Sequence, residues 1–185
     1  MARLTWLGLV AIIAGACATD DGVDRTLGAI PSGDTPERVD IGRYLGLWYE
    51  IASIPMGFQE SCFNTTALYD VIDDVTVSVH NECNWGKSDA QPLSIDGTAT
   101  VTDPGTNAKL LVDFGFNQSP YWIVDLGEAP PGEPYPWAAV SNDTRDSLWV
   151  LARTAKIPDA RFEAIYDRLE DRGFDPARML ITPQR

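Results

Sequence analysis

The chain has 185 residues, a length that predicts one domain able to bury a hydrophobic core without a structural metal. It carries 14 Lys and Arg residues against 27 Asp and Glu residues, for a formal net charge of -13. So few cations cannot neutralise a phosphate backbone, which excludes nucleic acid as a partner, and an anionic lipid surface would repel the chain.

The first segment, residues 1–16, predicts an export signal. An early cation precedes an apolar run from Leu4 to Ile13, which is too short to span a bilayer. Three small residues then stand directly before Cys17, an arrangement that resembles the lipobox at which bacterial prolipoproteins are cut after a diacylglycerol is attached to the thiol. We expect lipidation of Cys17. Ordinary signal cleavage after Ala18 is the alternative.

Residues 17–38 are rich in Gly, Pro and Asp and contain few apolar side chains. This composition predicts a flexible tether between the lipid and a folded domain over residues 39–185. Because Ala18, and not an acidic residue, directly follows Cys17, no inner-membrane retention signal is present, and the expected location is the cell envelope, as an outer-membrane lipoprotein that faces the periplasm.

From Val39 onward the apolar residues recur with a period of two, as in Val75, Val77 and Val79, which indicates strands with one face toward a core. Turn-forming residues separate eight such runs. The expected strands are 46–54, 63–72, 75–84, 94–102, 108–115, 120–126, 137–142 and 147–153. Eight antiparallel strands with short links predict an all-β fold, an up-and-down β-barrel that holds one small ligand.

One helix is expected after the strands, starting at Pro158-Asp159 and ending at Gly173. Its apolar residues share one face and are Phe162, Ile165, Tyr166 and Leu169. A helix with a single apolar face must pack on a large surface, and the barrel wall is the surface available. The last apolar run, Met179 to Ile181, predicts a short additional strand.

The three cysteines are an odd number for an exported protein. Lipidation accounts for Cys17. Cys62 and Cys83 lie at nearly equal distances on either side of the Asp73-Asp74 turn, so a hairpin would bring them together and a bulge would absorb the mismatch. We predict a disulfide between them; an unpaired reactive thiol is the other interpretation.

Two segments resemble motifs of the lipocalin family. Residues 43–51, with Gly46 and Trp48, are similar to the G-x-W segment of its first strand, and residues 148–153 resemble the segment around its late arginine. The similarity runs from Val39 to Gln184 and is closest to the bacterial outer-membrane and apolipoprotein D-like members. It implies that Arg153 stacks on Trp48 at a closed barrel end. The Pro-rich stretch 128–136 departs from the family pattern.

The same resemblance implies which side chains meet the ligand. Those expected to face the cavity, or to lie near its mouth, are Tyr69, Asn81, Trp149, Leu151, Phe114, Phe116 and Tyr121. An apolar wall with a few polar groups suits a fatty acid, a lysophospholipid or a similar amphiphile. We therefore expect a carrier of a small hydrophobic ligand.

Catalysis has little support in the sequence. The single histidine, His80, falls on the polar face of its strand, and no nucleophile elbow, dinucleotide fingerprint or cluster of metal ligands is present. We expect no enzyme, no cofactor and no metal. Two alternatives stay open. A buried acid or base inside the cavity would favour an enzyme acting on a lipid or isoprenoid, and a barrel without a void would favour an envelope interaction protein filled by its own side chains.

Overall fold

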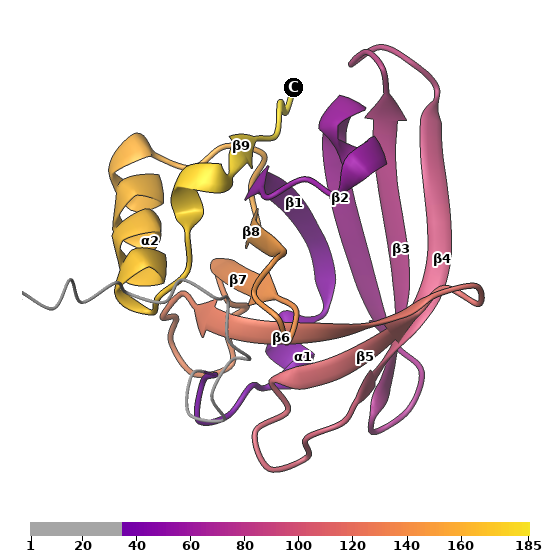
Figure 1. Ribbon diagram of the computed structural model, residues 1–185. Helices are drawn as coiled ribbons and strands as arrows, with labels where there is room; N and C mark the ends of the chain where they lie inside the picture. Colours follow the sequence, from indigo (N-terminus) through magenta and orange to yellow (C-terminus); the bar gives the residue numbers. More distant parts are fainter. Residues whose placement is uncertain (1–34) are drawn as a thin grey trace, which may run out of the picture.

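The computed structural model describes residues 35–185, so the expected signal peptide, Cys17 and most of the expected tether lie outside it. Eight strands form the barrel, and each pairs antiparallel with the next. They are β1 (Gly46–Ser53), β2 (Cys62–Val71), β3 (Thr76–Trp85), β4 (Pro92–Val101), β5 (Lys109–Asp113), β6 (Gln118–Leu126), β7 (Trp137–Ser141) and β8 (Leu148–Ala152). Because β1 pairs with both β2 and β8, the sheet closes on itself (Figure 1). The predicted eight-stranded barrel is confirmed, with every strand end within two residues of its expected position.

The alternation of side chains sorts the barrel into two apolar layers. Inward-facing residues such as Val79 and Ala99 belong to a core inside the barrel. A second core lies between the outer face of β7 and β8 and the helix α2 (Asp159–Asp171). The predicted helix is therefore confirmed, and Figure 1 shows it beside the barrel on the side away from β3 and β4.

Helix α2 is fixed to the barrel by apolar and ionic contacts. Ile165 and Leu169 are fully buried against the barrel. Arg168 makes two hydrogen bonds, of 2.7 and 2.6 Å, with the carboxylate of Asp125, whose side chain is 4% exposed. No helix within residues 35–185 combines the length and apolar character that crossing a bilayer requires.

Three short helices were not predicted: α1 (Ile41–Tyr44), η1 (Gly57–Ser61) and η2 (Pro176–Arg178). Each spans about one turn, so none shows a repeating apolar pattern. The side chain of Asp40 caps α1 by accepting a hydrogen bond from the Arg43 backbone N–H at 3.3 Å. This helix turns the chain across one end of the barrel before β1 begins.

The C-terminal segment completes the wall between β1 and β2. These strands pair only from Gly46 to Tyr49 on the β1 side, and beyond that point β9 (Leu180–Ile181) pairs with β1 instead. Residues after β9 reach across the gap: the Asn64 N–H donates to the Pro183 carbonyl at 2.8 Å. The Gln184 side-chain amide donates to the carbonyl oxygens of Glu50 and Thr65, each at 2.8 Å. The predicted short strand is thus present. Together with residues 182–185 it forms a seam that joins β1 to β2.

The predicted disulfide is also present. Cys62 and Cys83 are bonded, with their Cα atoms 5.5 Å apart. Between Phe63 and Thr66 the register of β2 against β3 shifts, which is the bulge that the unequal spacing required. The bridge ties β2 to β3 at the end of the barrel opposite α1.

Replacing both bridged cysteines by serine should lower the free energy of unfolding by about 2–4 kcal/mol, because the unfolded chain gains the freedom that the closed loop removes. Urea denaturation of the double variant beside oxidised wild type measures the difference. Wild type unfolded in a reducing buffer is the control and should match the variant. Equal midpoints for oxidised wild type and the variant would contradict a stabilising role.

Candidate functional site: the barrel interior

The closed end of the barrel is built on Trp48, which is fully buried. The guanidinium carbon of Arg153 lies 3.6 Å from the centre of the Trp48 ring, the stacking that the sequence motifs imply. At the edge of the ring, the indole N–H donates to the Tyr44 carbonyl at 2.8 Å. The tryptophan is therefore held in one position by its ring face and its polar edge.

Arg153 also binds the backbone around this end. Its guanidinium donates to the carbonyls of Leu47 at 2.8 Å, Arg43 at 2.9 Å and Tyr44 at 3.1 Å, and its Nε donates to the Tyr135 carbonyl at 3.2 Å. Gly46 has φ of 91°, and a Cβ built there would lie 3.6 Å from the guanidinium. That distance is an ordinary van der Waals contact, so the requirement for glycine comes from the positive φ, which glycine adopts without strain.

The Pro-rich stretch forms an ordered loop that docks on α1. The Arg43 guanidinium donates to the carbonyls of Ala129, Pro130 and Glu133, and it stacks over the Tyr135 ring at 4.3 Å. These contacts show how the segment that departs from the family pattern is arranged: it covers the same closed end.

Three tyrosines cross the barrel directly above this floor. Tyr121 from β6 hydrogen-bonds to Tyr44 from α1 at 2.7 Å and accepts from Tyr69 of β2 at 3.0 Å. Burial raises the pKa of Tyr69 to about 12 and raises the pKa values of Tyr44 and Tyr121 well above 10.0, so all three hydroxyls stay protonated. The lower part of the interior is therefore filled by side chains of the protein itself.

The upper part of the interior is more open. Trp149, Phe114, Ala67 and Asn81 face inward, and the first three pack against the inner core, yet each is only partly buried. Their remaining accessible surface makes the end opposite α1, the open end, the candidate entrance to the interior.

The expected ligand residues do not all lie at this entrance. Tyr69 and Leu151 are buried, at 4% and 6% exposure, and Tyr121 joins Tyr69 in the tyrosine chain. Phe116, by contrast, is 81% exposed in the turn between β5 and β6. It lies on the rim and not on the wall, because a side chain beyond the last strand residue is no longer directed by the alternation of the sheet.

A buried carboxyl group in the wall was missed by the sequence analysis. Glu50 is only 7% exposed and accepts hydrogen bonds on one oxygen, Oε1, from Ser53 at 2.9 Å and from Thr182 of the C-terminal segment at 2.5 Å. Burial raises the pKa of Glu50 above its ordinary value of 4.5, and the two hydrogen bonds partly oppose this. The signal was available, since Glu50 follows Trp48 by two residues on one strand and shares its inward face.

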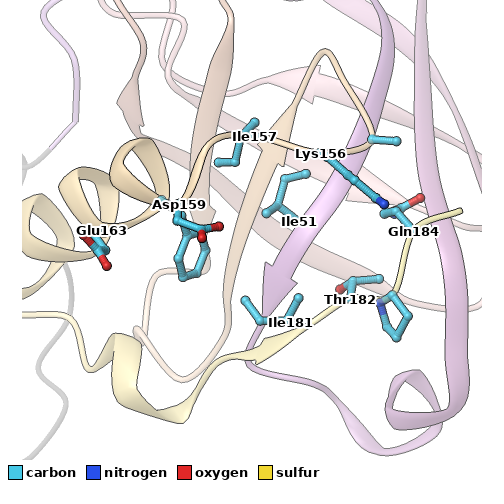
Figure 2. A pocket seen from close by; sticks show the side chains of 11 residues that line it. Ile51, Lys156, Ile157, Asp159, Glu163, Ile181, Thr182 and Gln184 are labelled. Atoms are coloured by element: carbon cyan, nitrogen blue, oxygen red, sulfur yellow. The ribbon is translucent and has the colours of Figure 1, made fainter.

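A hollow of about 580 Å³ lies outside the barrel, beneath the start of α2 (Figure 2). In Figure 2 its floor is formed by Ile51, Ile157 and Ile181, with Asp159 and Glu163 on one side and Thr182 and Gln184 on the other. Thr182 lines this outer groove and also donates to Glu50. The C-terminal segment therefore separates the groove from the barrel interior.

The polar groups on the outer face do not form a catalytic arrangement with this interior. His80 Nδ1 lies 2.7 Å from Asp96 Oδ1 on the outside of β3 and β4, and the histidine side chain is 42% exposed. Across residues 35–185, no group of three or more His, Cys, Asp or Glu residues is placed to hold a metal ion. The candidate site is the aromatic-lined interior of the barrel, with one buried carboxyl group in its wall.

Comparisons with known proteins agree with this architecture. A family model described as "Lipocalin-like domain" matches residues 39–184. Mouse apolipoprotein D is 30% identical, over 98% of this chain and 96% of its own. Temperature-induced lipocalin-1 of Arabidopsis thaliana is 31% identical, over 79% and 80%. The outer membrane lipoprotein Blc of Vibrio cholerae is 28% identical, over 79% of this chain and 83% of its own.

Solved structures share the fold. Lobster apocrustacyanin A1 superposes with a TM-score of 0.60 at 16% identity, covering 78% of this chain and 79% of that one. Insecticyanin from the tobacco hornworm superposes with a TM-score of 0.61 at 17% identity, covering 84% and 86%. At this level of identity the likeness is evidence for the fold alone.

Replacing Arg153 by lysine should lower the free energy of unfolding by at least about 2 kcal/mol, because an ammonium group cannot donate to four carbonyls and stack on Trp48 at once. Thermal and urea unfolding measure this loss. Arg161→Lys on the exposed face of α2 is the matched control and should change stability by less than about 0.5 kcal/mol. If the two variants unfold alike, Arg153 does not hold the closed end.

Proposed function

The chain belongs to the lipocalin family, and from that premise we propose that it binds a small hydrophobic or amphiphilic ligand inside its barrel and carries or stores it at a membrane. Members of this family bind small hydrophobic ligands. The observation that carries the proposal is the division of the interior: tyrosines and Trp48 fill the closed end, whereas partly buried Trp149 and Phe114 line an opening at the other.

The chemistry of this opening favours an amphiphile such as a fatty acid or a lysophospholipid. An alkyl chain gains up to about 0.8 kcal/mol for each methylene that it buries, before the cost of association, so micromolar affinity needs no charged contact. Polar atoms on the inner face of the wall, including the amide of Asn81, are available to a head group. A ligand with one polar end therefore fits an interior that is closed at one end.

We also propose that Cys17 carries the lipid that holds the protein to the outer membrane. The supporting observations are the small residues before Cys17 and the 28% identity to a protein named outer membrane lipoprotein Blc. A short polar tether would then place the barrel close to the membrane that supplies or receives its ligand.

A second candidate, an enzyme acting on a lipid held in the barrel, is favoured by Glu50. This carboxyl group is buried in the barrel wall, and its pKa is raised by burial, as a general acid or base requires. A partner for it is harder to assign, because His80 lies on the outer face. Chemical conversion of a bound lipid that stops in Glu50→Gln would support this candidate over the carrier.

Fluorescence titration with a lysophospholipid should show saturable binding in the micromolar range, and Trp149→Glu should weaken it by about tenfold or more because the variant places a charge in the apolar opening. The reporter can be identified with two further variants. Trp149→Phe should remove most of the ligand-induced change, whereas Trp122→Phe, on the outer face of β6, should retain it. Binding that survives Trp149→Glu unchanged would refute this placement of the ligand.

Replacing Cys17 by serine should release the protein from membranes into the soluble envelope fraction, because serine cannot accept the thioether-linked lipid. Fractionation of cells that express wild type or the variant measures this, and mass spectrometry of the mature N-terminus identifies the modification. A wild-type N-terminus at Thr19 would contradict the anchor.

A further inference from the structure

We infer that the barrel prefers ligands whose head group donates hydrogen bonds, a hydroxyl or an ammonium group, and that Glu50 and Asn81 are the acceptors that receive it. This inference rests on the proposed function and specifies the chemistry of its ligand. It depends on two polar side chains that the fold places on β1 and β3, with β2 between them in the same sheet.

Glu50 offers one free acceptor atom. Ser53 and Thr182 both donate to Oε1, and the other carboxyl oxygen, Oε2, has no hydrogen-bond partner among residues 35–185. The ion pairs of this part of the chain likewise do not include Glu50. A carboxyl group that is 93% buried, held by two neutral hydroxyls and without a cation, has capacity for a donor from outside the protein.

Asn81 offers a second acceptor. Its Oδ1 is buried and has no hydrogen-bond partner in the described part of the chain. The register of the sheet places it near Glu50: Trp48 pairs with Ala67, and Ala67 pairs with Asn81. Asn81 is thus level with Trp48 on the inner face, and Glu50 is the next inward position of β1 toward the open end.

A third unpartnered oxygen lies on the strand between them. Thr65 Oγ1, at the bulge of β2, is also buried and without a hydrogen bond within residues 35–185. Buried polar atoms are satisfied in nearly all native structures, so two buried unpartnered oxygens on the adjacent strands β2 and β3, with the partnerless Oε2 of Glu50 on β1 beside them, are unusual. A ligand that donates hydrogen bonds to this wall would satisfy groups that the protein alone leaves unpaired.

The same wall disfavours an anionic head group. A fatty-acid carboxylate has no proton to donate, and it would bring a negative charge toward the carboxyl group of Glu50. An ammonium group would instead be drawn to it, and a hydroxyl would donate without a charge penalty. The expected order of affinity at neutral pH is therefore ammonium or hydroxyl first and carboxylate last.

Three amphiphiles with the same dodecyl chain test this order: dodecylamine, dodecanol and laurate. Each is titrated against the full chain, below its micelle concentration, by displacement of a fluorescent hydrophobic probe. Wild type should bind dodecylamine and dodecanol about tenfold or more tightly than laurate, since one unpaired or repelled head group is worth about that factor. Equal affinity for all three would overturn the inference while leaving the proposed carrier function intact.

Two variants assign the preference to its residues. Glu50→Gln keeps an acceptor for Ser53 and Thr182, and it should reduce the preference for dodecylamine over laurate by about tenfold. Asn81→Leu should weaken the binding of dodecanol by a few-fold or more and leave the affinity for the probe unchanged. The matched control is Glu82→Gln, next to Asn81 on the outward face of β3, which should change neither ratio. Thermal unfolding of each variant verifies its fold.

The outcomes separate the two levels of the proposal. An unchanged amine-to-laurate ratio in folded Glu50→Gln would remove Glu50 from the site. Absence of binding by every amphiphile and by the probe would instead overturn the carrier function, and the head-group inference with it.

Discussion

The guanidinium group of Arg153 organises the closed end of this barrel. Four carbonyl oxygens, from α1, from the start of β1 and from the Pro-rich loop, accept hydrogen bonds from it. These three segments do not pair with one another as strands, so backbone pairing alone could not satisfy all four oxygens. An arginine suits this position because it carries a permanent charge and several donors in one plane, and because its flat face can stack on Trp48. Arg153 thereby holds Trp48 in place, and the tyrosine chain packs above Trp48. Access to the interior is then possible only from the other end.

The barrel thereby acquires a gradient along its axis. Near α1 each hydroxyl of the tyrosine chain is hydrogen-bonded to another tyrosine hydroxyl. This part of the interior is therefore rigid and offers no free polar group of that chain to a ligand. Toward the open end the wall contains polar atoms without partners and aromatic rings that are only partly covered. The Cys62–Cys83 bond lies at that same end, where β1 and β2 have separated, so it restrains the strands that the incomplete pairing leaves least supported.

The sequence predicted those features that local pattern controls. Strands, the amphipathic helix and the cysteine pair follow from the period of apolar residues and from their distances to a turn, and all agree with the structure. One-turn helices such as α1 have no period to detect. The seam could not be predicted for another reason: the hydrogen bond from the Gln184 side chain to Glu50 joins residues 134 positions apart, and no local pattern indicates it. Glu50 was missed although its strand position indicated an inward face, since a glutamate is ordinarily assigned to solvent.

The seam formed by the C-terminal segment has a consequence for how the protein is made. Strands β1 and β2 emerge early during synthesis, but the gap between them is filled by Thr182 to Arg185, which follow all eight barrel strands in the sequence. The wall therefore cannot be sealed until these residues have also been synthesised. Sealing of the barrel is thus a late step of folding, and the eight strands alone leave the gap between β1 and β2 open.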